Sequence, residues 1–243
     1  MVDVRFLAAG ESALIVEFGS AISPEINSRV MNLNNVLSRS KLKGITECVP
    51  TFRSLMVCYD CSEISFNSLV ESIKEMLDNT DYSSSSKKRV IKIPVCYDSE
   101  FGEDLEDVAA HTGLSIEEVI ERHSAPEYLI YMLGFLPGFA YLGGMDPKIV
   151  TPRLKNPRTK IPAGSVGIGG EQTGIYPLAS PGGWRLIGRT PVRPYDPGRK
   201  NPIIYAAGDY IRFIPVDKAE YFRINELVKK REYECEITEV DVK

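Results

Sequence analysis

The sequence predicts an α+β protein in which a small α/β sandwich is followed by an all-β barrel or sandwich. Strand-like and helix-like segments alternate up to about residue 79, as expected for helices packed on a sheet. Farther along, 13 of the 19 glycines lie between Gly134 and Gly198, and 12 of the 16 prolines lie between Pro126 and Pro202. Such a density favours short strands and tight turns over long helices. Because apolar residues are interleaved there, a folded β region is predicted in preference to a disordered linker.

The first domain is expected to contain two strands, a helix, two strands and a second helix. The segments VRFLA and ALIVEFG predict two strands joined by a turn at Gly10. Ser23 and Pro24 suit the N-cap and first position of a helix whose apolar residues continue to Leu37. CVPTF and SLMVCY predict two more strands, and the apolar spacing from Phe66 to Leu77 predicts the second helix. We expect this α/β sandwich to occupy residues 1–85, with the polar stretch NTDYSSSSKKR as the linker.

The second domain, expected over residues 90–243, begins with the strand VIKIPVCY and continues with two short helices. LEDVAAHTGLSIEEVIERHS resembles a helix-turn-helix, with a capping box formed by Ser115 and Glu118. A DNA-reading helix must face phosphates, whereas the second helix presents three glutamates and one arginine. Nucleic-acid binding is therefore not expected, and the helix pair is predicted to pack as a cover on the β region.

The glycine-rich part of this domain contains three bounded apolar runs, SVGI, GIYPL and WRLIG, which predict strands of a small barrel or sandwich. After it, DYIRFIPV predicts a closing strand, AEYFRINELVKK a helix and YECEITEV an edge strand. Residues 134–198 also carry eight basic and three acidic side chains, although the whole chain has a net charge of −4. This excess suits a small anion held by arginine, and it equally suits a solvated basic face.

Composition predicts a globular cytoplasmic protein. The 243 residues are 43% hydrophobic, which is enough for a sizeable core. The first residues lack the features of a signal peptide, and no run reaches the roughly 18 apolar residues of a membrane span. The five cysteines are odd in number and irregularly spaced, as in a reducing compartment, and Cys58 and Cys61 have no second pair to complete a zinc site. Neither a metal nor a membrane is expected.

A series of motifs resembles the family of 5-oxoprolinase B subunits, which includes the kinase inhibitor KipI and has also been labelled allophanate hydrolase subunit 1. The motifs occur in order along most of the chain: GFLPGFAYLGG, TPR, IPAGSVGI, QTGIYPLASPGGW and IGRTP. Gly169 is a small departure, because the family commonly carries alanine there. The resemblance implies that the second domain is a cyclophilin-like β-barrel.

His123 is the candidate catalytic residue. A neutral imidazole can accept a proton from an attacking water or donate one to a leaving nitrogen. The family has a histidine at the matching position before its GFLPGF motif. A histidine at the end of a short helix can equally be a cap that interacts with the helix dipole.

The remaining candidates are aromatic, polar or basic residues of the glycine-rich region. An apolar wall, amide-binding polar groups and carboxylate-binding arginines form the predicted substrate site: Arg158, Gln172, Thr173, Tyr176, Trp184 and Arg189. The aromatic GFLPGFAYLGG segment is predicted to contact a partner through Phe135, Pro137, Phe139 and Tyr141. Packing in the barrel core is an equally good explanation for Phe135 and Tyr141.

The resemblance implies the B subunit of a multi-subunit, ATP-dependent 5-oxoprolinase, which converts 5-oxoproline to glutamate together with homologues of the A and C subunits. The chain has no GxxxxGK[ST] loop and no complete dinucleotide fingerprint. ATP is therefore expected to be used by the assembled complex, and the isolated chain is expected to be inactive. The alternative implied by the same motifs is a KipI-like inhibitor that binds a sensor histidine kinase.

Overall fold

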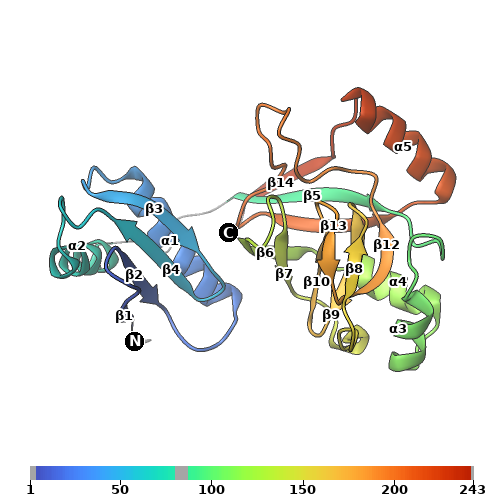
Figure 1. The fold of residues 1–243 in the computed structure, drawn as a ribbon, viewed down its shortest axis with the longest axis horizontal. Coiled ribbons are helices and arrows are strands. Elements are labelled where there is room, and N and C mark those ends of the chain that lie inside the picture. Colours follow the sequence, from blue (N-terminus) through green and yellow to red (C-terminus); the bar gives the residue numbers. More distant parts are fainter. Residues whose placement is uncertain (1–3, 80–86, 242–243) are drawn as a thin grey trace. The chain divides into compact units, whose positions relative to one another are not determined.

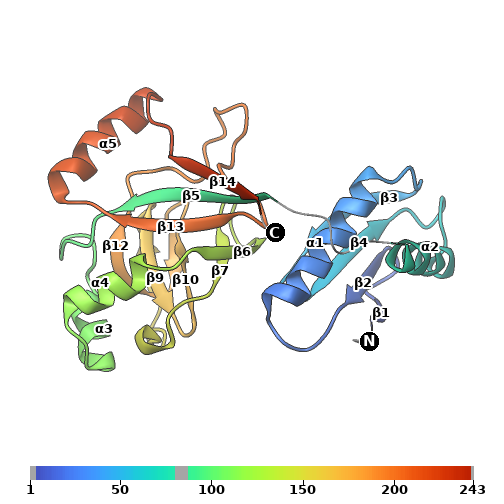
Figure 2. The same cartoon turned by 180° about the vertical axis from the view of Figure 1, so that it is seen from behind.

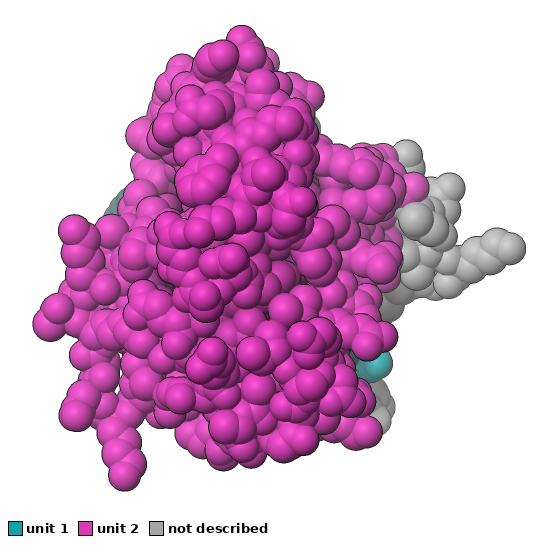
Figure 3. Space-filling model, turned by 90° about the vertical axis from the view of Figure 1, so that its right-hand side faces the viewer, with its two compact units in different colours: residues 1–86, 243 teal, residues 87–242 magenta. Residues whose placement is uncertain are grey.

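The computed structural model describes residues 4–79 and 87–241. The chain divides into two compact units, residues 1–86 together with residue 243, and residues 87–242. Figures 1 and 2 show each unit from two sides, and Figure 3 shows one face of the second unit as a space-filling surface. The centre of the predicted linker, residues 80–86, lies outside the described residues.

The first unit is a four-stranded antiparallel sheet with two helices. Its elements are β1 (Arg5–Ala8), β2 (Ala13–Glu17), α1 (Pro24–Arg39), β3 (Ile45–Pro50), β4 (Ser54–Tyr59) and α2 (Phe66–Asp78), in the sheet order β1-β2-β4-β3. Alternate residues of β2 and β4 are buried, as in a sheet with one face on a core. They pack against apolar residues of both helices, and α1 lies across that face (Figure 1). The element order predicted for this part of the chain is confirmed.

Helix α1 begins where the sequence predicts, because Ser23 caps it. The Ser23 hydroxyl accepts a hydrogen bond from the Ile26 amide at 3.2 Å, and Pro24 occupies the first turn. A cap of this kind contributes about 1 kcal/mol to helix stability. The start of α1 is therefore set by residues that are close together in the sequence.

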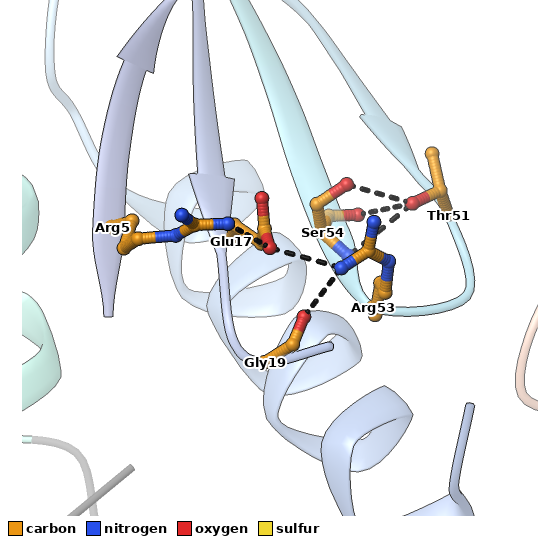
Figure 4. A network of polar contacts seen from close by, with 6 residues as sticks. All are labelled: Arg5, Glu17, Gly19, Thr51, Arg53 and Ser54. Carbon is orange, nitrogen blue, oxygen red and sulfur yellow. Dashed lines mark hydrogen bonds and ion pairs between the residues drawn. The ribbon is translucent and has the colours of Figure 1, made fainter. Parts of the chain in front are cut away.

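Charged side chains join the strands of this sheet at one end (Figure 4). The Glu17 carboxylate accepts hydrogen bonds from the guanidinium groups of Arg5 at 2.7 Å and Arg53 at 3.0 Å. Arg53 also donates to the Gly19 carbonyl at 2.9 Å. The hydrogen bond from Arg5 is the main cause that holds the pKa of Glu17 below its ordinary value. The network links β1, β2 and the turn before β4.

The second unit contains ten strands, three α-helices and one 3₁₀ helix in its described residues. The first half comprises β5 (Lys87–Val95), α3 (Leu105–Thr112), α4 (Ile116–Ser124), β6 (Tyr128–Leu133), β7 (Ala140–Gly143) and a 3₁₀ helix (Pro147–Ile149). The second half comprises β8 (Arg158–Ile161), β9 (Ser165–Gly169), β10 (Gln172–Ile175), β11 (Ser180–Gly182), β12 (Arg185–Arg189), β13 (Tyr210–Pro215), α5 (Lys218–Lys230) and β14 (Ile237–Asp241). The strands predicted from SVGI, WRLIG and DYIRFIPV are therefore present. The strand predicted from GIYPL is shifted, because β10 covers Gln172–Ile175 and residues 176–178 lie outside it.

Three sheets surround the core of this unit. The largest has the strand order β14-β5-β13-β6-β7, and the others are β10-β9-β12 and β11-β8. Beyond the end of β5, Cys96 exchanges two backbone hydrogen bonds of 2.9 Å with Arg189 of β12, so the two larger sheets meet there. Over the described residues the strand ladders remain separate sheets, and no closed barrel forms. The predicted β region is thus present as several sheets around one core.

Helices α3 and α4 pack on this core, as the sequence predicts. The capping box is present, because the Glu118 amide donates to the Ser115 hydroxyl at 3.1 Å and the Glu118 carboxylate accepts from the Ser115 amide at 2.8 Å. Val119 and His123 are the buried residues of α4. In the figures α5 lies on the opposite side of the unit from α3 and α4 (Figures 1 and 2).

Candidate functional site

Five of the predicted site residues form one aromatic cluster. Phe139 lies at its centre, with ring centroids 5.1 Å from Tyr141, 5.5 Å from Phe135, 5.6 Å from Trp184 and 5.7 Å from Tyr176. Most of these rings meet edge to face, which is a favourable geometry for aromatic pairs. The residues come from β7, from the loop before it and from both sides of β11. The predicted substrate wall and the predicted partner surface are therefore one structure.

Glycines of β9 and β10 make room for the indole ring of Trp184. A Cβ atom on Gly169 would come within 2.3 Å of that ring, and a Cβ on Gly174 would come within 3.2 Å. Trp184 is 5% exposed, and the guanidinium of Arg153 lies 5.9 Å from the centre of its ring. Gly169 is the position at which the resembling family commonly has alanine. In this chain the indole occupies the space that an alanine methyl would need.

The loop GFLPGF, between β6 and β7, presents Phe135 to solvent. Two short-range hydrogen bonds tighten it, from the Leu136 amide to the Gly134 carbonyl at 2.7 Å and from the Phe139 amide to the Leu136 carbonyl at 2.9 Å. Phe135 has a φ of 65°, a left-handed conformation that is unusual for an aromatic residue, and it is 64% exposed. Pro137 is exposed, whereas Phe139 is buried. The loop residues and Ile203 line a shallow cavity of about 340 Å³.

His123 is fully buried and has a hydrogen-bond partner at each ring nitrogen. Nδ1 lies 2.7 Å from the Tyr97 hydroxyl, and Nε2 lies 2.8 Å from the Thr173 hydroxyl. The Thr173 hydroxyl donates its single hydrogen to the Gly167 carbonyl at 3.0 Å, so it can only accept from the imidazole. The imidazole is therefore the tautomer protonated at Nε2, and Tyr97 donates to Nδ1.

The surroundings of His123 keep the ring neutral. Its ring stacks on Phe213 with centroids 4.7 Å apart, and the Tyr128 hydroxyl donates to the His123 carbonyl at 2.8 Å. Burial lowers the pKa of His123 to about 3 and raises the pKa of Tyr97 well above its ordinary value. This arrangement ties α4 to the β9–β10 hairpin, and it brings together two predicted site residues, His123 and Thr173.

Arg158 is held by an acidic side chain of the protein itself. Its guanidinium donates to Asp104 at 2.8 Å, and the Asp104 carboxylate also accepts from the Leu186 amide at 2.6 Å. The hydrogen bond to Asp104 is the main cause that raises the pKa of Arg158. One guanidinium nitrogen, Nη1, is buried without a partner among the described residues. Arg158 is therefore largely committed to the start of α3.

The two remaining substrate candidates, Arg189 and Gln172, contact residues outside the aromatic cluster. The Arg189 guanidinium lies 5.1 Å from the centre of the Phe101 ring. Gln172 begins β10 and pairs with Gly169 across the hairpin, where it is half-buried.

The predicted substrate residues are thus dispersed. Tyr176 and Trp184 lie in the aromatic cluster, and Thr173 lies beside His123. The others lie elsewhere: Arg158 beside the start of α3, Gln172 at the start of β10 and Arg189 at the end of β12.

A larger cavity, of about 590 Å³, contains none of the predicted site residues. Its lining includes Arg89, Arg193, Arg199 and Arg231, together with Tyr233 and Cys235. The only sequence signal for it is the pair of arginines in PVRPYDPGRK, because Arg89 and Arg231 are far away along the chain. Within residues 4–79 and 87–241, no group of three or more His, Cys, Asp and Glu side chains is placed to hold a metal ion. No helix in those ranges is both long and apolar enough to span a bilayer.

Comparison with known proteins shows the family. A family model described as the carboxyltransferase domain, subdomain C and D, matches residues 4–205. A curated 5-oxoprolinase B subunit from Bacillus subtilis (strain 168) is 41% identical over 227 residues, which is 89% of this chain and 95% of that protein. The chain belongs to the family of 5-oxoprolinase B subunits. The resemblance inferred from the sequence motifs is confirmed.

Solved structures similar to this chain include two larger proteins. The crystal structure of TTHA0988 is 38% identical in sequence to the present chain, with a TM-score of 0.75. The match covers 88% of the present chain and 40% of the TTHA0988 chain. The urea carboxylase of Kluyveromyces lactis is 22% identical with a TM-score of 0.81, over 98% of this chain and 24% of its own. The second likeness concerns the fold alone. The present chain spans less than half of either solved chain.

Proposed function

We propose that this chain is the B subunit of a multi-subunit, ATP-dependent 5-oxoprolinase, which opens the ring of 5-oxoproline to give glutamate. The observation that carries the proposal is the 41% identity to a curated 5-oxoprolinase B subunit, which extends over 95% of that protein. So long a match to a protein of that name favours the enzyme component over a KipI-like kinase inhibitor. We expect the complex to act in the cytoplasm, where ATP is available.

ATP supplies the free energy for opening an unactivated lactam. Its cleavage yields ADP and phosphate, while two water molecules are consumed in forming glutamate and inorganic phosphate. Transfer of the γ-phosphoryl group to the amide oxygen would make the ring carbon more electrophilic before water attacks it. Because this chain has no phosphate-binding loop motif, we assign the nucleotide to the assembly with homologues of the A and C subunits.

Within that assembly, we assign the exposed GFLPGF loop to the contact with the homologue of the C subunit. Phe135 is 64% exposed on a loop whose other aromatic neighbour, Phe139, is buried in the aromatic cluster. An exposed aromatic ring on a rigid base is typical of interface anchors, because little side-chain entropy is lost on binding. Pro137 in the same loop is also exposed, and Phe139 packs against Tyr141, Tyr176 and Trp184. The family resemblance implies a cyclophilin-like barrel for the second unit, whereas its described strands form separate sheets around one core.

Reconstitution tests the proposal. The chain is purified alone and also co-expressed with homologues of the A and C subunits, and ATP-dependent release of glutamate from 5-oxoproline is measured. We expect no release from the isolated chain and turnover by the complex. A complex that forms but releases no glutamate would refute the assignment, as would full turnover by the isolated chain. Stoichiometric binding of a histidine kinase, without any binding of the two other components, would favour the inhibitor.

A further inference from the structure

The cavity of about 590 Å³ lies in a part of the second unit that the aromatic cluster does not reach. Its walls come from β5, from the segment between β12 and β13, and from the end of α5 and the chain that follows it. The apolar part of the lining is formed mainly by aliphatic and tyrosine side chains: Ile91, Val192, Ile203, Ile204, Tyr205 and Tyr233. A cavity of a few hundred Å³ with apolar walls and a few polar groups is the usual form of a small-molecule site.

The carboxylate of Asp196 lies in the cavity lining beside arginine side chains. The Asp196 side chain accepts a hydrogen bond from the Gly198 amide at 2.8 Å, which is the main cause of its lowered pKa. The charges of Arg231, Arg199 and Arg193 lower that pKa further. The nearest of these contacts in the structure, between Arg231 and Asp196, measures 3.8 Å. The positive charge of the lining therefore lowers the pKa of its Asp196 carboxylate.

The positive charge of Arg199 is not matched by an acid within hydrogen-bond distance in the described part of the chain. Its Nη2 donates to the backbone carbonyls of Arg193 at 2.7 Å, Pro202 at 3.0 Å and Pro194 at 3.2 Å. Its Nε is buried and has no acceptor among the described residues. Carbonyl oxygens fix the guanidinium in place but leave its formal charge uncompensated. Such a fixed cation beside an apolar cavity favours an anionic ligand.

Arg89 contributes less to the positive charge of the cavity, because it is already paired with Asp209. It donates to Asp209 at 2.7 Å and to the Ile204 carbonyl at 3.2 Å. The lining as a whole holds four arginines against the carboxylates of Asp196 and Glu234. Because Asp209 neutralises Arg89, the rest of the lining carries three arginines and two carboxylates, which is a net positive charge.

We propose that this cavity binds the carboxylate of a small organic acid whose apolar body lies against the aliphatic wall. The planar guanidinium groups of Arg193 and Arg231 suit a carboxylate, which they can contact through paired hydrogen bonds. Arg199, whose Nη2 is bound to backbone carbonyls, adds a fixed positive charge. If the proposed function holds, 5-oxoproline is such an acid, since it combines one carboxylate with a compact ring. The choice of 5-oxoproline as the ligand rests on the proposed function, whereas the carboxylate site itself does not. It differs from the sequence prediction, which gave this role to Arg158 and Arg189.

Calorimetric titration of the full chain tests the proposal with 5-oxoproline and with 2-pyrrolidinone, the same lactam without the carboxylate. The test variant is Arg193→Gln combined with Arg231→Asn, because asparagine tolerates the left-handed conformation that Arg231 adopts at φ 61°. The control is Arg212→Gln, an exposed arginine on β13 outside the cavity lining. We expect the double variant to bind 5-oxoproline roughly ten- to hundredfold more weakly, the control to bind as the wild type does, and 2-pyrrolidinone to bind far more weakly than 5-oxoproline.

Equal affinity of the double variant and the wild type would overturn the proposal, as would equal affinity for the two lactams. Binding of inorganic phosphate without binding of 5-oxoproline would replace the organic acid with a phosphate group as the ligand, and would overturn the carboxylate assignment. Melting temperatures of all variants check that the fold is retained. Failure of the proposed function is seen separately, as a complex with the wild-type chain that releases no glutamate. A complex that turns over, with unchanged 5-oxoproline binding in the double variant, refutes the cavity alone.

Discussion

The imidazole of His123 donates through Nε2 to the hydroxyl of Thr173 at 2.8 Å, inside the protein, and this bond joins helix α4 to strand β10. The sequence predicts both residues as parts of a reaction site, one catalytic and one substrate-binding. The second ring nitrogen is occupied by the Tyr97 hydroxyl at 2.7 Å. In this conformation the ring has no free position from which to exchange a proton with a ligand. The geometry therefore favours a role in positioning the β9–β10 hairpin.

Replacement of His123 by asparagine should mainly reduce stability. The shorter side chain cannot reach both Tyr97 and Thr173, and it loses the stack on Phe213. We expect the free energy of unfolding in urea to fall by about 2–5 kcal/mol, from lost packing and unsatisfied buried hydroxyls. The control is His111→Asn, because His111 is exposed on α3, and that variant should unfold like the wild type. If the folded complex with His123→Asn loses about 10²–10⁴-fold in turnover, a catalytic His123 would be supported after all.

The stability of the chain should depend on pH through the same histidine. The folded state holds His123 with a pKa of about 3, whereas the ordinary value is 6.5. Because the unfolded chain binds the proton more tightly, this contribution is fully present above pH 6.5 and is lost as the pH falls from 6.5 toward 3. The expected slope is about 1.4 kcal/mol per pH unit below the ordinary pKa. Urea unfolding of the wild type and of His123→Asn between about pH 7 and pH 5 measures it, and parallel curves for the two proteins would contradict the prediction.

Alanine at position 169 should displace the indole of Trp184. The added methyl would lie about 2.3 Å from that ring, so the ring must move or the hairpin must open. We expect a loss of about 1–3 kcal/mol in stability, as in other overpacked cores. Trp184 is the only tryptophan in the sequence, so its fluorescence reports the change directly. Gly183→Ala is the matched control, because its nearest neighbour would be 3.6 Å away. An unchanged emission spectrum in Gly169→Ala would show that the ring does not lie there in solution.

Replacement of Phe135 by asparagine should weaken the proposed complex and leave the chain folded. Asparagine tolerates the φ of 65° at this position, and the lost ring is mostly exposed in the isolated chain. An interface anchor of this size contributes about 2 kcal/mol or more to binding, which is roughly thirtyfold in Kd. Binding to the homologue of the C subunit is measured by calorimetry, with Ile22→Asn, at a residue 59% exposed in the first unit, as the control. Equal loss of affinity in both variants would remove the GFLPGF loop from the interface.

Much of the fold could be predicted because its signals are local. The Ser23 cap with Pro24, the capping box of Ser115 with Glu118 and the period-two burial of β2 and β4 each depend on residues close together in the sequence. The aromatic cluster was also predictable in membership, since its residues share one glycine-rich region. What the sequence did not indicate is which of these rings would be exposed, and only Phe135 is.

The polar residues were harder to assign, because their roles depend on partners that are distant along the chain. Arg158 pairs with Asp104, and His123 with Thr173 and Tyr97, and none of these pairs has a spacing that marks it. The arginine-lined cavity brings together residues from β5, from the segment after β12 and from beyond α5. Charge counts over a sequence window could detect the basic excess, but they could not show which arginines line the same cavity.

The position of β5 in its sheet has a consequence for biosynthesis. This strand opens the second unit, yet its two neighbours are β13, which runs parallel to it, and β14. Residues 96–209 must therefore leave the ribosome before either neighbour is available, and until then β5 exposes an apolar strand with two unpaired edges. The first unit, whose strands all pair within residues 5–59, has no such delay. We expect the first unit to fold during synthesis, while the second unit depends on chaperones until its last strands emerge.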